Sequence, residues 1–114
     1  MSALKILTDA RELLSVPERW TQGWFAKDID GHDVSYGSPK ACRWCLSGAL
    51  GNVDPLGDAL ASFAASELLD LALGRGVSCG YFVEWQDASD RTHGEVLQLL
   101  DKAINLARER EGSQ

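Results

Sequence analysis

The sequence has few basic residues, few cysteines and no long apolar run, and each shortage excludes a class of protein. Eleven lysines and arginines stand against 17 aspartates and glutamates, which gives a net charge of -6. We expect no nucleic-acid partner, because such binding needs clustered positive charge to displace counterions. Three cysteines are an odd number, which does not fit a secreted disulfide framework.

Signals for export and for membrane insertion are missing as well. The first five residues lack the basic region and apolar run of a signal peptide, and no window approaches the roughly 18 apolar residues of a membrane span. We therefore expect a cytoplasmic protein without membrane contact. Its 114 residues match the usual size of one domain, and we predict a single domain over 1–114 with a frayed tail at 112–114.

Hydrophobic periodicity predicts about four helices. They cover residues 3–14, 40–50, 54–74 and 92–111. Asp54 and Pro55 mark the start of the third helix, because aspartate caps free amides and proline suits the first helical position. A capping box from Thr92 to Glu95 marks the start of the last helix, and a similar pattern at 15–18 predicts a single extra turn.

Two extended stretches, residues 21–28 and 32–36, flank Asp30 and Gly31 and predict a β-hairpin, since Gly31 accepts the positive φ of such a turn. Residues 28–33 superficially resemble a calcium loop but are interpreted as this turn. A piece around Phe82 is the candidate third strand, because an isolated hairpin is marginal. The predicted fold class is α+β, mainly helical, with a small antiparallel β-hairpin or three-stranded sheet.

Three short motifs follow one another along the chain. They are Trp20-Thr21-Gln22-Gly23, then Arg43-Trp44-Cys45-Leu46 with Gly48-Ala49-Leu50, then Trp85 and Asp87 followed by Arg91-Thr92 and Val96-Leu97. From about Leu13 to Ala107 the chain resembles a family of small uncharacterised proteins found in bacteria and their phages. The resemblance implies no activity. It implies an accessory protein of a phage or mobile element, or of a host that carries one.

Cys42 and Cys45 form a Cys-x-x-Cys pair. On the predicted helix their thiols would share one face, where they could act as a redox pair or, with Cys79 and a histidine, hold zinc. No βαβ unit and no second closely spaced ligand pair accompanies them. We therefore favour buried structural cysteines, with thiol-redox or zinc chemistry as the alternative.

The chain has no complete catalytic set: it contains no Gly-x-Ser-x-Gly, no phosphate-binding glycine loop and no His-Glu-x-x-His. His93 with Asp87 could form an acid–base pair, although acidic residues near a helix start are also what its dipole favours. Four tryptophans are many for this length, and tryptophan is enriched at binding hot spots. We predict a protein-binding site at Trp24, Trp85, Asp87 and Arg91.

These observations favour a non-catalytic protein-binding accessory or regulatory module. We expect it to be phage- or mobile-element-associated and to act on a host protein, with no catalytic residues, cofactor or metal. The partner is a protein, and a homo-oligomer stays open. The alternative is a thiol-redox or zinc-binding protein that uses Cys42, Cys45 and Cys79.

Overall fold

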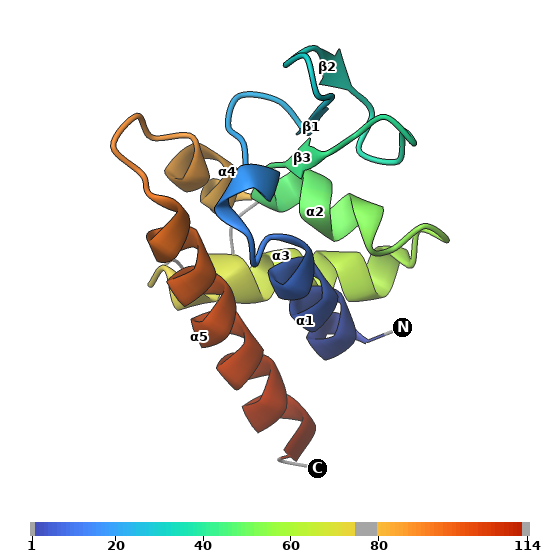
Figure 1. Ribbon diagram of the computed structural model, residues 1–114. Coiled ribbons are helices and arrows are strands. Elements are labelled where there is room, and N and C mark those ends of the chain that lie inside the picture. The colour runs from blue at the N-terminus through green and yellow to red at the C-terminus, as the bar shows by residue number, and fades with distance from the viewer. Residues whose placement is uncertain (1, 75–79, 113–114) are drawn as a thin grey trace.

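The computed structural model describes residues 2–74 and 80–112, and the fold is α+β and mainly helical, as predicted (Figure 1). The helices are α1 (Ala3–Leu13), the 3-10 turn η1 (Pro17–Arg19), α2 (Leu46–Asn52), α3 (Ala59–Ala72), α4 (Tyr81–Gln86) and α5 (His93–Gly112). The strands are β1 (Ala26–Lys27), β2 (Asp33–Val34) and β3 (Arg43–Trp44). In Figure 1 the small sheet lies above α2, and α3 crosses behind α1 and α5.

The core lies where α1, α3 and α5 pack against one another. The largest fully buried apolar side chains of these three helices are Ile6, Leu7, Leu68, Leu69, Val96 and Leu100. Removing one such side chain from water stabilises a fold by about 1.5–3 kcal/mol. At the surface, the Arg11 guanidinium joins α1 to α5 through the Asp101 carboxylate, with Nε 2.7 Å from Oδ1.

The predicted β-hairpin is confirmed, but its strands are short. β1 pairs antiparallel with β2, with Ala26 opposite Val34, and Gly31 takes a φ of +84° in the connecting turn. Residues 22–25, predicted as part of the first strand, form bends instead. The hairpin is therefore small, and the segment before it forms a loop instead of continuing β1.

The third strand is β3, so the prediction that the piece around Phe82 fills this place is wrong. The strand order is β2-β1-β3, and Ala26 of β1 lies opposite Trp44 of β3. Trp20 also forms a parallel bridge to Trp44, which brings the first two sequence motifs together. The sheet thus recruits a strand from a segment whose apolar pattern looked helical.

The helix predicted over residues 40–50 begins only at Leu46, because pairing with β1 draws Arg43 and Trp44 into the sheet. The side chain of Cys45 caps the helix: its Sγ accepts the backbone N–H of Gly48 at 3.3 Å. Cys42 and Cys45 therefore flank a strand. The redox interpretation had assumed that they share one face of a helix, and this assumption is wrong.

The start of α3 was also predicted wrongly. Asp58 is its N-cap, with Oδ1 accepting the backbone N–H of Ala61 at 3.1 Å. Asp54, the predicted cap, is buried and accepts the Ser62 hydroxyl at 2.6 Å, which ties the preceding loop to the helix. As a result, three residues of the predicted apolar stripe are exposed: Leu56, Leu60 and Phe63.

Residues 81–85, predicted as an extended piece, form most of α4, and residues 77–79 of the loop predicted before them lie outside the described residues. The buried carboxylate of Asp70 in α3 explains the difference. It accepts the backbone N–H groups of Gly80 at 3.1 Å and Phe82 at 2.8 Å. Asp70 thus accepts hydrogen bonds from free backbone amides at the start of α4. Because Asp70 lies in another helix, no local sequence pattern reveals this contact.

The capping box that starts α5 is confirmed. Thr92 Oγ1 accepts the Glu95 backbone N–H at 3.2 Å, and Glu95 Oε1 accepts the Thr92 backbone N–H at 2.9 Å. The pattern at 15–18 accompanies the predicted extra turn, η1, but forms no side-chain cap. Gly112, predicted to begin a frayed tail, is the last residue of α5, while residues 113–114 lie outside the described residues. Within the described ranges, no helix is long and apolar enough to cross a membrane.

Candidate functional site

The buried amide of Gln86, at the end of α4, connects the three sequence motifs. Its Oε1 accepts the indole Nε1–H of Trp20 at 2.6 Å and the backbone N–H of Leu46 at 3.2 Å. Its Nε2 donates to the Thr21 carbonyl at 3.4 Å and to the Asp87 carboxylate. Because Gln86 is fully buried, these bonds replace all of its contacts with water.

The loop at residues 21–25 is fixed to the C-terminal end of α4. Gln22 Nε2 donates to the backbone carbonyls of Gln86 at 2.7 Å and Ala88 at 2.8 Å. The backbone N–H of Gly23 donates to Asp87 Oδ1 at 3.0 Å, with Gly23 at a φ of +88°. The loop thereby supplies partners for carbonyls that a helix end leaves free.

On its other side the same loop rests on the start of α2. The carbonyl of Phe25 accepts the backbone N–H of Cys45 at 3.2 Å. A Cβ placed on Gly48 would lie only 1.9 Å from that carbonyl oxygen. Gly48 is therefore the residue that lets the loop backbone approach the helix so closely.

This double attachment leaves two adjacent aromatic side chains facing solvent. Trp24 is 46% exposed and Phe25 is 43% exposed. Their ring centroids are 5.5 Å apart in an edge-to-face arrangement, and the exposed ring of Tyr36 follows 6.3 Å from Phe25. We call Trp24, Phe25 and Tyr36 the aromatic row.

A hollow of about 150 Å³ lies beside the aromatic row. It is lined by Gly23, Trp24, Phe25, Cys45, Ser47, Val83 and Asp87. Its lining is mostly apolar, and Asp87 is the acidic member. The structure therefore brings two of the four predicted binding residues, Trp24 and Asp87, to one place.

The other two predicted binding residues, Trp85 and Arg91, pack on each other instead. The Arg91 guanidinium carbon lies 3.9 Å from the centre of the Trp85 ring, and Nε donates to the Trp85 carbonyl at 2.9 Å. Arg91 also pairs with Glu95 at 3.2 Å. Neither lines the hollow, and their contacts brace the connection from α4 to α5.

The sequence interpretation missed Gln86, Phe25 and Val83. The position of Gln86, between the motif residues Trp85 and Asp87, was the one local signal that could have pointed to it. Phe25 and Val83 gave no such signal, because their roles depend on contacts between segments distant in the sequence.

His93 and Asp87 do not form the acid–base pair that was considered. His93 Nε2 donates to the carbonyl of Leu14 at 2.6 Å, and its ring lies beside Trp20. Asp87 accepts from Gly23 and Gln86. The imidazole thus anchors the start of α5 to the end of α1.

The cysteines of the Cys-x-x-Cys pair have different surroundings. Cys42 is partly exposed, and its thiol donates to the Lys27 carbonyl over 3.6 Å. Cys45 is buried, and burial raises the pKa of its thiol, with the charge of Asp87 adding to the rise. Cys79 lies outside the described residues, so the zinc alternative stays a prediction, as does the expectation of no cofactor.

We expect Cys45 to react with iodoacetamide at least about tenfold more slowly than Cys42 near pH 8, because only the thiolate is nucleophilic. Trypsin cleaves after Arg43 and so separates the two cysteines for mass spectrometry. Equal alkylation rates would contradict the burial of Cys45.

The raised pKa of Cys45 also makes stability depend on pH, because the folded state holds the thiol proton more tightly than the unfolded state does. This contribution to stability is present below the pKa of the thiol in the unfolded chain and is lost as pH rises through its pKa in the folded protein.

The acidic turn at residues 28–33 uses its first carboxylate internally. Asp28 Oδ1 accepts the backbone N–H groups of Asp30 at 3.0 Å and His32 at 2.9 Å. The hydrogen bond from the His32 backbone is the main reason why the pKa of Asp28 is lowered. The side chains of Asp28, Asp30 and His32 lie close together, and the hydrogen bonds to Asp28 are those of an Asx turn. The segment is thus a turn, as the sequence interpretation held.

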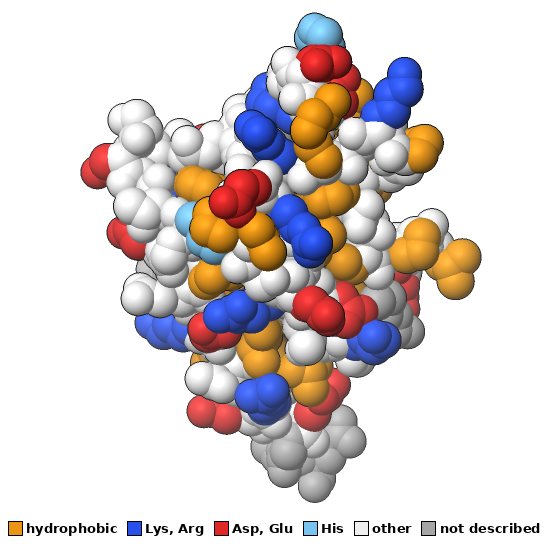
Figure 2. Space-filling view, in the orientation of Figure 1, with side chains coloured by type: hydrophobic (Ala, Val, Ile, Leu, Met, Phe, Trp, Pro, Cys, Tyr) orange, Lys and Arg blue, Asp and Glu red, His pale blue; other side chains and the backbone are white. Residues whose placement is uncertain are grey.

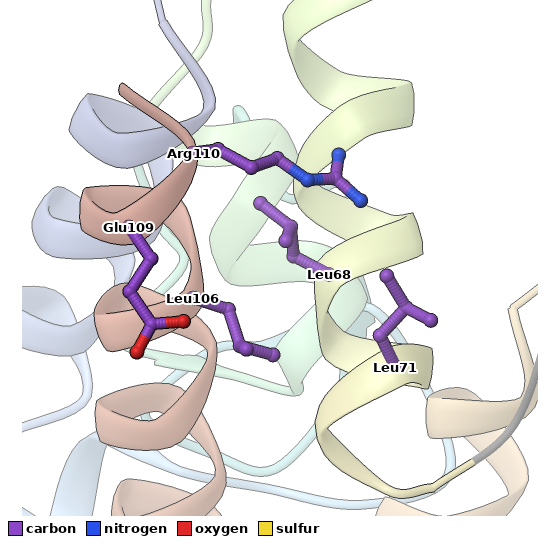
Figure 3. A pocket seen from close by; sticks show the side chains of 5 residues that line it. All are labelled: Leu68, Leu71, Leu106, Glu109 and Arg110. Atoms are coloured by element: carbon purple, nitrogen blue, oxygen red, sulfur yellow. The ribbon is translucent and has the colours of Figure 1, made fainter. Parts of the chain in front are cut away.

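A larger hollow, of about 550 Å³, lies between α3 and α5 (Figure 3). Leu68, Leu71 and Leu106 line it, while Arg110 reaches across from α5 toward α3. Arg110 Nη2 lies 3.3 Å from Glu67 Oε1, so this side chain already bridges the two helices. We interpret this hollow as a gap left where two helices pack at the surface, because its lining residues offer no set of convergent polar groups.

Comparison with known proteins gives a family and no activity. A family model described as "Family of unknown function (DUF6197)" matches residues 1–106. No curated protein and no solved structure matches the chain. Any function therefore rests on the geometry of the site.

Proposed function

We propose that this chain, which belongs to the DUF6197 family of unknown function, is a non-catalytic protein-binding module that contacts its partner through the aromatic row and the adjoining hollow. The observation that carries the proposal is that Trp24 and Phe25 are held outward by hydrogen bonds on both sides of their loop. Aromatic side chains fixed in this way lose little conformational entropy on binding.

Single exposed apolar residues are common on proteins and need no explanation. The aromatic row differs because neighbouring rings contact one another and two of its members, Trp24 and Phe25, line a hollow. On the face of the molecule that Figure 2 shows, acidic and basic side chains are interspersed with apolar ones, and no large patch of one charge stands out. Shape and aromatic contact thus favour a protein partner.

The setting is part of the same proposal. We place the module in the cytoplasm, as an accessory protein of a bacterium or its phage that acts on a host protein. This setting rests on the resemblance that the three sequence motifs carry.

We expect Trp24→Ala to weaken partner binding by about 30-fold or more, as loss of a hot-spot tryptophan costs about 2 kcal/mol. The partner is captured from host lysate with tagged wild-type protein and identified by mass spectrometry, and its affinity for each variant is then measured by calorimetry. Circular dichroism should show an unchanged fold, because the indole is half exposed.

Two matched variants test the location of the contact. Ile29→Ala removes an apolar side chain that is 80% exposed at the hairpin tip, and Leu60→Ala removes one from the exposed side of α3. Both should bind within about twofold of wild type, as expected for residues outside a hot spot. Loss of binding with Leu60→Ala but not with Trp24→Ala would move the contact to α3 and sink the proposal.

A further inference from the structure

We infer that the hollow beside the aromatic row receives one basic side chain, a lysine or an arginine, from the partner protein. The inference rests on the proposed function and adds the chemistry of the group that is bound. It depends on three properties of the hollow: the charge of Asp87, the rings of Trp24 and Phe25, and the small volume.

The charge of Asp87 is not neutralised by a basic side chain within the described ranges. Its Oδ1 accepts from the backbone N–H of Gly23 and from the amide of Gln86, and both donors are neutral. None of the described residues that line the hollow is lysine, arginine or histidine. These hydrogen bonds hold the carboxylate in position beside the hollow, where a cation brought by a partner would gain a charge-assisted contact.

The aromatic lining adds a second attraction for a cation. Trp24 and Phe25 both line the hollow, and aromatic rings attract ammonium and guanidinium groups through their quadrupoles, with tryptophan the most effective. The methyl groups of Val83 provide an apolar surface on which the aliphatic stem of a lysine or arginine packs. Cys45 adds no charge of its own, since burial raises the pKa of its thiol and keeps it neutral, so Asp87 is the charged group of the lining.

The volume favours a single side chain over a small-molecule ligand. The hollow measures about 150 Å³, whereas pockets for small molecules usually measure about 300–1,000 Å³. A neighbouring hollow of about 310 Å³ shares Ser47 and Val83 with it and contains Glu67, which is paired with Arg110. A peptide segment seated with its basic residue beside Asp87 would have this second hollow for its next residues.

The test is a titration followed by ¹H–¹⁵N NMR with three capped amino acids: the N-acetyl methylamides of lysine, arginine and norleucine. Norleucine has the same stem as lysine without the charge. We expect lysine or arginine to shift the signals of Gly23, Val83 and the Trp24 indole, with at least about threefold tighter binding than norleucine, as expected from an added cation–π contact and ion pair.

Asp87→Asn removes the charge but keeps an oxygen that can accept from Gly23. We expect it to weaken binding of the basic probes by about three- to fivefold and to leave norleucine binding unchanged. Asp90→Asn, an exposed acidic residue of the same connection, is the control and should change neither.

Equal binding of norleucine and lysine would overturn the inference and leave the proposed function standing, since the hollow would then accept apolar side chains. Equal effects of Asp87→Asn and Asp90→Asn would also overturn it, by reducing the preference to general surface charge. If no probe shifts the signals of the hollow, the inference is wrong, while capture of the partner with the Trp24 variant still decides the proposed function.

Discussion

Gly48→Ala is expected to destabilise the fold by about 3 kcal/mol or more, which is a large part of the stability of a domain of this size. The added Cβ would lie 1.9 Å from the carbonyl oxygen of Phe25, and this obstacle is backbone that cannot rotate away. Either α2 or the loop that carries Trp24 must move. Urea unfolding followed by circular dichroism measures the loss, and indole fluorescence reports movement of the loop.

Two other helical glycines provide matched controls. A Cβ on Gly51 would meet the ring of Tyr36 at 2.8 Å, but that ring is partly exposed and can swing outward, so Gly51→Ala should change stability little. A Cβ on Gly94 meets nothing within 4 Å, so Gly94→Ala should stabilise α5 by up to about 1 kcal/mol. If Gly48→Ala behaved like Gly94→Ala, the close contact between loop and helix would not exist in solution.

Gln86→Met is expected to cost about 3–5 kcal/mol, although methionine has nearly the same length. The substitution leaves two donors without an acceptor, the buried backbone N–H of Leu46 and the partly buried indole N–H of Trp20. Each unsatisfied donor costs about 1–3 kcal/mol. Thermal and urea unfolding measure the effect, and a shift in tryptophan emission should accompany it because Trp20 loses its partner.

Gln98→Met is the control for this experiment, because Gln98 is an exposed glutamine on α5 and its replacement should change stability by less than about 0.5 kcal/mol. Gln86→Glu separates the two halves of the amide. It keeps an acceptor for Trp20 but places a second carboxylate beside Asp87, so its destabilisation should grow as pH rises and the new group ionises. Wild-type stability of Gln86→Met would mean that the network does not join the three motifs.

Local signals predicted the parts of the fold that depend on neighbours in the sequence. The first helix, the turn at Gly31 and the capping box of Thr92 and Glu95 are confirmed because their stabilising contacts lie within a few residues. The three wrong elements each depend on a distant partner. β3 pairs with β1, Asp70 of α3 accepts backbone amides at the start of α4, and the loop before α3 is held by the hydrogen bond from Ser62 to buried Asp54.

The sequence predicted only part of the candidate site, again because some of its contacts join segments that are distant in the sequence. Trp24 is one of four tryptophans, a residue type enriched at binding hot spots, and Asp87 belongs to a sequence motif. That both line one hollow depends on Gln86, whose role requires the fold to bring Trp20 and Leu46 to it. Trp85 and Arg91 looked equally available in the sequence, and only their mutual stacking shows that they brace the chain.

The packing of α1 on α5 has a consequence for how the chain folds. The first helix completes its core only against the last one, as the contact between Arg11 and Asp101 illustrates. Contacts between such distant segments form late, because the chain must close a long loop before they reward it. Packing of α1 against α2 and α3 therefore leaves part of its apolar side uncovered until α5 is in place.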